Sequence, residues 1–341
     1  MSIDGNGLKG IRVGLCGFAY GHQTNYGACL LREAGVTGIG ASPAPHATPQ
    51  EVASAREAAA RLGVPFFASL EEMLDQGKPD FVSLAVHPAY NPEAVEAVAG
   101  RKIAILSEKP LAFDAEGLER IRKAVKESGV YFALAVAAAK HARPVAQVLK
   151  QFHDGAIGKP RVAYYQFLQS KGPLYATPAD SPFPIGEIDI FGPYAFLFLN
   201  EIFGGKPTRI YAVKGAYFYP WYRKLGIHDL GVVHVEYEGG GVASIVLGRT
   251  TTKCIPNTDG RIEVIGDAGA LHVDSLNFNR IIGYHGNGAP EHALQWHETD
   301  SNFAQFYIRD VMAAYRSGTK APVDFDEAVL SQECVFQVTQ K

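Results

Sequence analysis

Short apolar segments alternate with amphipathic segments in the first part of the chain. The apolar segments are continuous, as expected of strands that are buried on both faces of a sheet, and they occupy residues 11–17, 36–42, 64–68, 80–86, 102–106 and 130–136. The segments between them have helical spacing, at residues 50–63, 69–77, 91–101 and 114–129. In the last of these, Asp114 stands at a plausible N-cap and Gly129 at the end. This alternation predicts an α/β fold with a Rossmann-type, doubly wound parallel sheet.

The pattern changes after residue 137. A helix over 142–155 precedes longer strand-like segments joined by turn signals such as EGGGV and GDAGAL, which are typical of antiparallel hairpins. These segments lie at 159–170, 208–218, 232–239, 241–248, 261–266, 270–274 and 280–286. Three further helices are expected, an apolar one over 190–205 and two at 301–318 and 324–340. The pattern therefore predicts a Rossmann-type α/β domain over 1–136, and over 137–341 an α+β domain with a large open antiparallel sheet that could cover a site or pair with another subunit.

Composition narrows the class of protein. The chain has 341 residues, of which 47% are hydrophobic and 20% charged, as in soluble globular proteins of two domains. A net charge of −3 without blocks of like charge argues against a nucleic-acid or membrane-surface protein. We see neither a signal segment nor an apolar run that approaches ~18 residues. Scattered cysteines without a CxxC pair indicate reduced thiols, so we expect a cytoplasmic protein; they are Cys16, Cys29, Cys254 and Cys334.

The first strand runs into the segment GLCGFAYGH. Dinucleotide-binding folds place G-x-G-x-x-G here, because glycines allow a tight turn and close approach to the pyrophosphate. Gly17 fits the first glycine, but Ala19 holds the second position and His22 the third. The position after a strand and before a helix still suits a phosphate. The residues expected to contact the cofactor here are Gly17, Phe18, Ala19, Tyr20, Gly21 and His22. A Rossmann-like fold that no longer binds dinucleotide is the alternative.

The second strand ends at Ser42 rather than at the acid that holds the adenosine ribose of NAD. No negative charge in this segment repels a 2′-phosphate, so the cofactor is NADP or NAD, with Ser42 among its contacts. His46 and Arg56 are candidate phosphate partners, although Arg56 also fits a solvated helix position.

Several segments together resemble one known family. VGLCGFAYGH, DFVSLAVHPAYNPEAVEAV, ILSEKPLAF, HDGAIGKPRV and RIEVIGDAGALHVD are similar to successive blocks of the glucose–fructose oxidoreductase, inositol dehydrogenase and MocA family. The E-K-P tripeptide, after the fifth predicted strand, is the most specific of these marks. The resemblance covers nearly the whole chain. It implies a two-domain NAD(P)-dependent oxidoreductase that acts on a sugar, a cyclitol or a sugar-derived alcohol, and a homo-oligomer (dimer or tetramer) formed through the open sheet.

The resemblance also implies roles for individual residues. The lysine of E-K-P, here Lys109, touches the reacting oxygen in the family, often beside a cis proline bond that would be Lys109–Pro110. Glu108 would orient Lys109 or bind near the nicotinamide amide, and both Glu108 and Lys109 are expected to contact the cofactor. His87 and Pro88, after the fourth predicted strand, would line the cofactor cleft; a simple turn is the alternative for His87.

The chain departs from the family in the second domain. Many members carry D-x-G-x-H on the apolar helix, with the histidine as acid/base. Aligned on Gly192, the histidine position holds Tyr194, and Asp189 lies one residue early. The family histidine after the fourth strand is replaced by Asn91, and a common arginine by His141 or, shifted, by Arg143. A tyrosine at the first of these positions occurs in one branch of the family.

The candidate catalytic residues are Lys109, Tyr194 and Asp189. Oxidation of an alcohol needs a group that accepts the hydroxyl proton. Tyrosine, with an ordinary pKa near ~10, is a poor base at neutral pH, but a nearby ammonium lowers that pKa. Lys109 and Tyr194 could therefore work as a pair, or Lys109 could take the proton itself. Asp189 fits a helix cap equally well.

One further cluster is open to two interpretations. Trp221, Tyr222, His228 and Asp229 lie in the irregular segment YPWYRKLGIHD. Aromatic faces suit a sugar ring, but an interface loop has the same composition. No histidine or carboxylate group has ligand-like spacing, so we expect no metal.

Three functions remain open. The first is the NAD(P)-dependent dehydrogenase or reductase of a carbohydrate-like small molecule. The second is a ligand sensor or scaffold without turnover, suggested by Ala19, Ser42 and the missing histidine. The third is glycoside cleavage through transient oxidation by tightly held NAD, which is known in one branch of the family.

Overall fold

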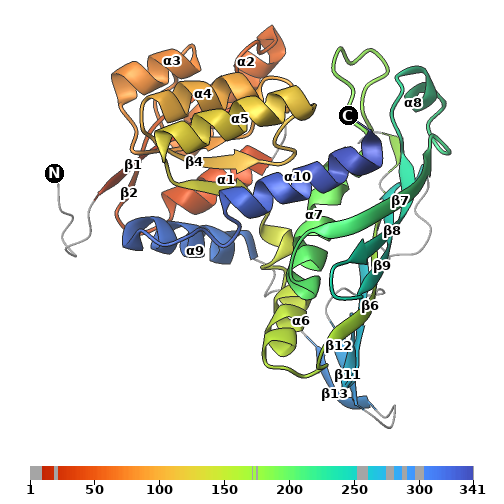
Figure 1. Ribbon diagram of the computed structural model, residues 1–341. Coiled ribbons are helices and arrows are strands. Elements are labelled where there is room, and N and C mark those ends of the chain that lie inside the picture. Colours follow the sequence, from red (N-terminus) through yellow and green to blue (C-terminus); the bar gives the residue numbers. More distant parts are fainter. Residues whose placement is uncertain are drawn as a thin grey trace. The chain divides into compact units, whose positions relative to one another are not determined.

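The computed structural model describes residues 10–18, 22–170, 172–173, 176–251, 260–273, 280–285, 290–295 and 303–340. The chain divides into two compact units. The first comprises Met1–Ala137 and Ala304–Val329, and the second Ala138–Phe303 and Leu330–Lys341 (Figure 1). This division differs from the expected one, 1–136 and 137–341, because a segment near the C-terminus belongs to the first unit.

Two hydrogen bonds to β5 explain why the segment near the C-terminus belongs to the first unit. The Tyr307 hydroxyl, fully buried, donates a hydrogen bond to the carbonyl of Leu134. The Leu134 N–H in turn donates to the carbonyl of Val323 at 3.1 Å. Helix α9 (Phe303–Ser317) and the start of α10 (Phe325–Thr339) are thus fixed to the last strand of the first unit. No local sequence pattern reveals such a long-range contact.

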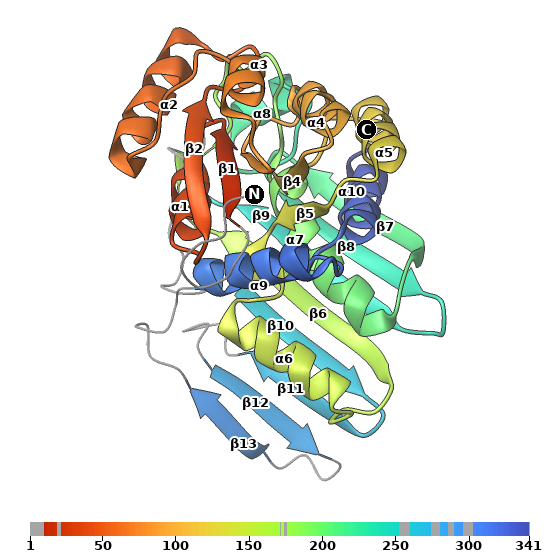
Figure 2. The ribbon, with the colours of Figure 1, turned by 90° about the vertical axis from the view of Figure 1, so that its left-hand side faces the viewer.

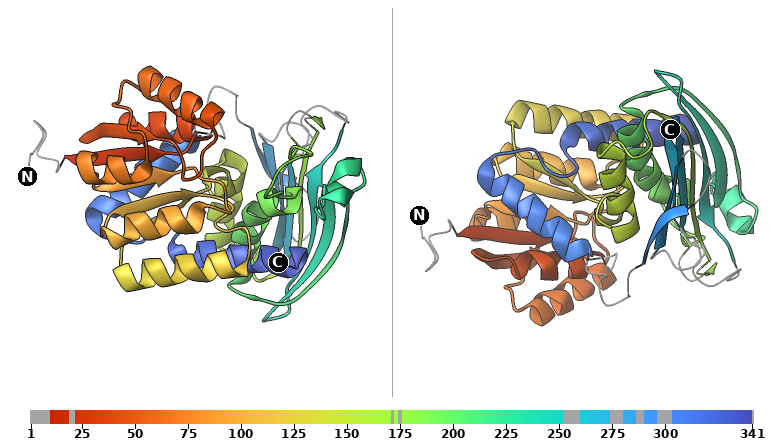
Figure 3. Two further views of the ribbon diagram at one scale, coloured as in Figure 1. Left: turned by 90° about the horizontal axis from the view of Figure 1, so that it is seen from above. Right: turned by 90° about the horizontal axis from the view of Figure 1, so that it is seen from below.

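The first unit is built on a five-stranded parallel sheet in the order β2-β1-β3-β4-β5. Its strands are β1 (Ile11–Cys16), β2 (Val36–Ser42), β3 (Phe81–Leu84), β4 (Ala104–Glu108) and β5 (Phe132–Ala135). Every residue of β3, β4 and β5 is buried, which accounts for their continuous apolar sequences. Helices lie on both faces of the sheet (Figure 3). The prediction of a doubly wound parallel sheet is confirmed.

The segment 64–68, VPFFA, is not a strand, so the prediction was wrong there. It forms a single parallel bridge between Ala41 and Phe66, with the Ala41 N–H donating to Pro65 and the Phe67 N–H to Ala41, both at 2.8 Å. Pro65 has no N–H with which to continue a ladder. The E-K-P tripeptide consequently follows the fourth strand of the sheet rather than the fifth.

The helix termini of the first unit follow local sequence rules. Helix α2 (Pro49–Leu62) begins with a capping box in which Thr48 and Glu51 satisfy each other's backbone N–H groups. Asp114 caps α5 (Ala115–Ser128), and Gly129 ends it in the left-handed conformation, as predicted. The remaining helical segments are α1 (His22–Leu31), α3 (Leu70–Glu72), a π-helical turn (Met73–Gly77) and α4 (Asn91–Gly100).

The second unit contains an eight-stranded sheet in the order β13-β12-β11-β10-β6-β9-β8-β7. Its strands are β6 (Pro160–Gln169), β7 (Pro207–Gly215), β8 (Leu230–Tyr237), β9 (Val242–Arg249), β10 (Gly260–Gly266), β11 (Gly269–Val273), β12 (Arg280–His285) and β13 (Pro290–Gln295). Neighbours pair antiparallel except β6 and β9, which are parallel, so the sheet is mixed and mostly antiparallel. Strand β13 was not predicted, since PEHALQ has a proline and no β-branched residue.

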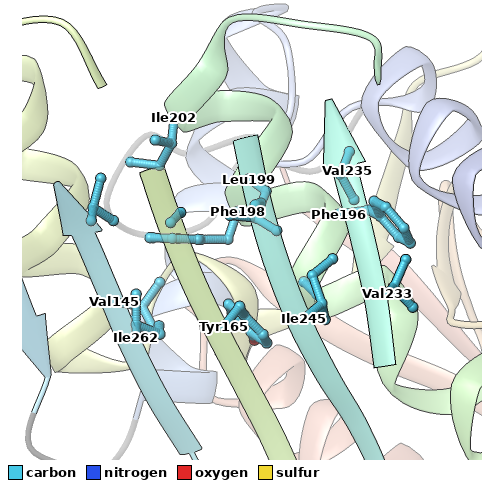
Figure 4. Packing of buried hydrophobic residues seen from close by; sticks show 14 of the residues in the cluster. Val145, Tyr165, Phe196, Phe198, Leu199, Ile202, Val233, Val235, Ile245 and Ile262 are labelled. Carbon is cyan, nitrogen blue, oxygen red and sulfur yellow. The ribbon is translucent and has the colours of Figure 1, made fainter. Parts of the chain in front are cut away.

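Helices cover one face of this sheet. Helix α6 (Arg143–His153) and α7 (Glu187–Phe203) pack their apolar side chains against β6, β8, β9 and β10 (Figures 2 and 4). The end of α10 approaches α7 closely at Gly192, where a Cβ atom would lie only 2.5 Å from Val335 Cγ2. The short elements of the unit are a 3-10 turn (Ala137–Ala139, which begins in the first unit) and α8 (Pro220–Lys224).

None of the helices in the described ranges is long and apolar enough to cross a membrane. The cytoplasmic location and the absence of nucleic-acid binding stay predictions.

Candidate active site

The loop after β1 requires a glycine at its first position. Gly17 has φ +83°, and a Cβ atom there would lie 2.3 Å from the carbonyl oxygen of Ala85. Its N–H donates to the carbonyl of Ser42 at 3.1 Å, so the ends of β1, β2 and β3 meet at this residue. Only glycine permits both this positive φ and the close contact between the loop and the segment after β3. Phe18, next in the loop, is buried.

Helix α1 begins at His22 directly after this loop. The predicted cofactor contacts Ala19, Tyr20 and Gly21 lie outside the described residues. Gln23 fixes the first turn of the helix, because its amide nitrogen donates to Cys16 O at 3.2 Å and to Ser83 O at 2.8 Å. Ser83 Oγ donates back to Gln23 Oε1 at 2.8 Å. The sequence reasoning missed Gln23, because its partners lie outside α1, at positions 16 and 83.

The E-K-P tripeptide is buried rather than a solvated turn. Glu108 and Lys109 are 6% and 8% exposed, and the Lys109–Pro110 bond is cis, as the resemblance implied. Asn91 holds this segment, since its amide nitrogen donates to Ser107 Oγ at 3.1 Å and to Leu111 O at 2.7 Å. Asn91, which stands where the family has histidine, is thus part of the support of β4.

Glu108 joins β4 to the start of α1. Its Oε1 lies 2.9 Å from His22 Nδ1, while Oε2 is buried without a hydrogen-bond partner in the part of the chain that the structure describes. A buried carboxylate oxygen without a donor is costly, and a ligand N–H or O–H would satisfy it. The structure therefore brings Gly17, His22, Ser42 and Glu108 together at the carboxyl edge of one sheet, where open α/β folds bind ligands.

Two phenols near Glu108 are held in the neutral form. Burial raises the pKa of Tyr26 well above its usual value and the charge of Glu108 raises it further, although the Ala137 N–H acts in the opposite direction. Burial likewise raises the pKa of Tyr307, with smaller contributions from Tyr131, Glu327 and Glu108. Neither phenol is suited to take a proton near neutral pH.

The other predicted cofactor contacts of the first unit, Ser42, His87 and Pro88, lie at the ends of strands or in the turn before α4. The Ser42 side chain is fully buried, and its backbone carbonyl receives the Gly17 N–H. His87 Nδ1 lies 3.2 Å from the Ala89 nitrogen, and the His87 carbonyl accepts the N–H of Asn91 at 3.0 Å, so the residue shapes the turn before α4. Pro88 is buried beside it. Their contacts with a cofactor stay predictions.

The predicted catalytic residues of the second unit lie on the first two turns of α7. Asp189 Oδ2 accepts the Gly186 N–H at 2.9 Å, which is the helix-capping role left open from the sequence. Tyr194 is half-buried and stacks on Phe167, with ring centroids 5.5 Å apart and planes 13° from parallel. Of the replacements noted near α6, His141 is half-buried, and the Arg143 side chain lies outside the described part.

A buried polar network surrounds the start of α7. Arg249 Nε lies 2.9 Å from Glu187 Oε1, and the side chains are 6% and 0% exposed. The Tyr222 hydroxyl donates to the same oxygen at 2.8 Å and accepts the Thr177 N–H at 2.7 Å. The guanidinium also lies over the ring of Phe191, 5.7 Å from its centroid. The sequence reasoning missed this ion pair, because its partners lie 62 positions apart in the chain, at 187 and 249.

The aromatic cluster of YPWYRKLGIHD is a packed structural element in the second unit. The Asp229 carboxylate, fully buried, accepts the N–H groups of Tyr217, Phe218 and Tyr219 at 2.7–2.9 Å. Trp221 Nε1 donates to Thr177 O at 3.0 Å. Within the described residues, no cluster of histidine, cysteine and carboxylate side chains could hold a metal ion.

The parallel sheet, the glycine turn after β1 and the helix that follows it define a Rossmann-type dinucleotide-binding domain. The sequence matches a family described as "Oxidoreductase family, NAD-binding Rossmann fold" over residues 11–136. It also matches the "GFO/IDH/MocA C-terminal domain" over residues 145–272. The chain belongs to the GFO/IDH/MocA oxidoreductase family.

Solved structures of several dehydrogenases share the fold. The WlbA dehydrogenase from Bordetella pertussis, solved with NADH and UDP-GlcNAcA, is 21% identical with a TM-score of 0.79, covering 97% of this chain and 96% of that one. The UDP-N-acetylglucosamine 3-dehydrogenase GnnA from Acidithiobacillus ferrooxidans is 19% identical with a TM-score of 0.77, covering 98% of both. The myo-inositol 2-dehydrogenase from Lactobacillus plantarum is 17% identical with a TM-score of 0.78, covering 97% of both. No curated protein sequence matches significantly.

Proposed function

We propose that this protein is an NAD(P)-dependent oxidoreductase that interconverts a secondary alcohol and a ketone on a sugar, a cyclitol or a sugar derivative. The observation that carries the proposal is the buried Glu108–Lys109 pair at the carboxyl end of β4, next to the start of α1. A lysine and a carboxylate are expensive to bury unless they have a task or partners. In a family of NAD-binding oxidoreductases, that task is contact with cofactor and substrate.

The residues of the first unit fit a dinucleotide. Gly17 allows the sharp turn after β1 to pack directly on the backbone of Ala85, and Glu108 Oε2 offers a buried acceptor for a hydroxyl or an amide N–H. The N-terminus of α1 suits the pyrophosphate. NAD, when bound, supplies the acceptor for the hydride that leaves the alcohol carbon. Gly17, His22 and Glu108 are the described residues that would hold it.

Lys109 and Tyr194 are the proposed catalytic residues. In this reaction the carbon gives up a hydride and the hydroxyl gives up a proton. Lys109 would hold the hydroxyl oxygen through its ammonium group and favour loss of that proton, and Tyr194, as the phenolate, would accept it and become the neutral phenol. Asp189 would act by fixing the start of α7, because one of its oxygens is already used by the Gly186 N–H.

The substrate class rests on the relatives. The WlbA dehydrogenase was solved with a nucleotide sugar, GnnA is a nucleotide-sugar dehydrogenase, and a third relative oxidises myo-inositol. We therefore propose a nucleotide sugar or a cyclitol, and a ring hydroxyl as the reacting group.

We also propose a homo-oligomer that is formed through the face of the large sheet opposite α6 and α7. Side chains alternate along the strands, so one face is buried and the other carries exposed apolar residues. Tyr211, Val213, Tyr164 and Val242 are 62%, 52%, 45% and 44% exposed there. They line or adjoin a shallow hollow of about 410 Å³ that also contains His234 and Ser244. An apolar patch of this kind marks a protein–protein contact.

Turnover assays with several classes of carbohydrate-like substrate test the proposal. The purified chain is incubated with NAD⁺ or NADP⁺ and UDP-sugars, free sugars, sugar acids or inositols, and reduced nicotinamide is followed by absorbance. Accumulation with one of these classes is the expected result. Cleavage of a glycoside without accumulation would establish the glycoside-cleaving alternative instead. If none of NAD⁺, NADH, NADP⁺ and NADPH raised the melting temperature, the sensor or scaffold would be favoured. A bound ligand at 100 times its Kd raises the free energy of unfolding by about 2.7 kcal/mol.

A further inference from the structure

The end of β2 lacks the acid that dinucleotide-binding folds use to hold the adenosine ribose. Ser42 closes the strand with a buried side chain, and residues 43–48 read PAPHAT. Of these, Thr48 is used to cap α2. The strand and the loop after it therefore supply no negative charge of their own.

The structure brings a carboxylate to this loop from another element. Glu93, in the first turn of α4, places its Oε2 2.8 Å from His46 Nε2. The His46 ring also packs against Tyr90, with centroids 4.9 Å apart, and its backbone takes the left-handed conformation at φ +57°. A hydrogen bond and a ring contact thus join the loop after β2 to the segment that follows β3.

The strand order puts this contact at the nucleotide edge. β1 lies between β2 and β3, and the segments that leave the carboxyl ends of β2 and β3 flank the loop that begins at Gly17. The Gly17 N–H donates to Ser42 O at 3.1 Å on one side, and the Ala85 N–H to Cys16 O at 2.8 Å on the other. Adenosine binds along this edge in a doubly wound sheet.

The backbone of Glu93 has a fixed position, while its carboxylate is partly exposed to solvent. Two residues before it, Asn91 is buried and bonded to Ser107 and Leu111, so the start of α4 has a set position. The side chains of Glu93 and His46 remain 48% and 56% exposed. A carboxylate oxygen is therefore accessible to a ligand while the pair stays formed.

We propose that Glu93 supplies the negative charge that β2 lacks and that the protein selects NAD(H) over NADP(H) through it. The inference rests on the proposed function. The carboxylate accepts a ribose hydroxyl of NAD and repels a 2′-phosphate. Two unit charges at ~4 Å in water change binding roughly five-fold. A phosphate monoester carries about 1.5–2 charges, so the expected preference is roughly ten- to thirty-fold.

The test is a pair of dissociation constants. NADH and NADPH are titrated by nicotinamide fluorescence into the full chain, into Glu93→Gln and into Glu96→Gln. Glu96 is the matched control, because it lies on the same helix but pairs with Arg120 at 2.6 Å. Thermal unfolding of each variant checks that the fold is intact.

Wild type is expected to bind NADH at least ten-fold more tightly than NADPH. Glu93→Gln should shrink that ratio about ten-fold, mainly through tighter binding of NADPH, and Glu96→Gln should leave it unchanged. An unchanged ratio in Glu93→Gln, or a wild type that prefers NADPH, would overturn the role of Glu93 while the proposed function stands. A wild type that binds neither cofactor would overturn both.

Discussion

Loss of Arg249 should destabilise the second unit more than any exposed ion pair could. In Arg249→Met, the Glu187 carboxylate keeps its Tyr222 hydrogen bond but loses its cation, at a position that is 0% exposed. Removing one partner of a buried pair costs roughly 3–5 kcal/mol, because the remaining charge is left in a medium of low polarity. Over the length of this unit, each kcal/mol lowers the melting temperature by about 2–4 °C. The expected fall is therefore roughly 6–20 °C.

Differential scanning calorimetry measures this fall, with two further variants for comparison. Arg209→Met breaks the pair with Glu236, whose side chains are 74% and 53% exposed, and should cost only about 0–1 kcal/mol. Combining Glu187→Leu with Arg249→Met removes both charges and should recover part of the loss. If Arg249→Met cost no more than Arg209→Met, the pair would not be a buried structural element and the reasoning would fail.

Three further predictions concern the cofactor loop, alkaline pH and assembly. Gly17→Ala should cost about 1–3 kcal/mol and weaken NADH binding in a fluorescence titration, because its Cβ would lie 2.3 Å from Ala85 O. Gly129→Ala, at φ +64° with no atom within 4 Å, is the control that should leave NADH affinity unchanged. Urea unfolding should show that the free energy of unfolding falls as pH rises above ~10, where the tyrosines of the unfolded chain ionise. Burial raises the pKa of the folded-state phenols, so their stabilisation is complete below that pH and is lost above it. A free energy of unfolding that stays constant would contradict burial as the cause of the raised pKa in Tyr26, Tyr165, Tyr222, Tyr237 and Tyr307. Light scattering should show a dimer or tetramer that Tyr211→Glu dissociates, and a monomeric wild type would refute assembly through the open face.

Local sequence patterns were enough to predict most helices and strands, but not every pairing between strands. Continuous apolar segments marked β1 to β5, and Asp114 and Gly129 marked the ends of α5, because these signals depend on neighbours in sequence. VPFFA was wrongly predicted as a strand, because four of its five residues are apolar and the effect of Pro65 on strand pairing was not considered. The parallel pairing of β6 with β9 joins segments about eighty residues apart, at 162 and 242, and no hairpin signal describes it.

The site was predictable only where a motif carried it. E-K-P identified Glu108 and Lys109, and their burial and the cis bond agree with that motif. Gln23, Glu93 and the Glu187–Arg249 pair were not predicted, because each acts through a partner that is distant in sequence.

The proposed reaction depends most on Lys109, which would hold the substrate's hydroxyl oxygen while the hydride passes from the neighbouring carbon to the nicotinamide. The direct test compares turnover and NADH affinity in wild type, in Lys109→Met, which preserves the buried volume, and in Lys123→Ala, an exposed lysine on α5. We predict that Lys109→Met binds NADH within about three-fold of wild type but loses kcat by roughly 10²-fold or more, while Lys123→Ala matches wild type in both. Full turnover in Lys109→Met would contradict the account.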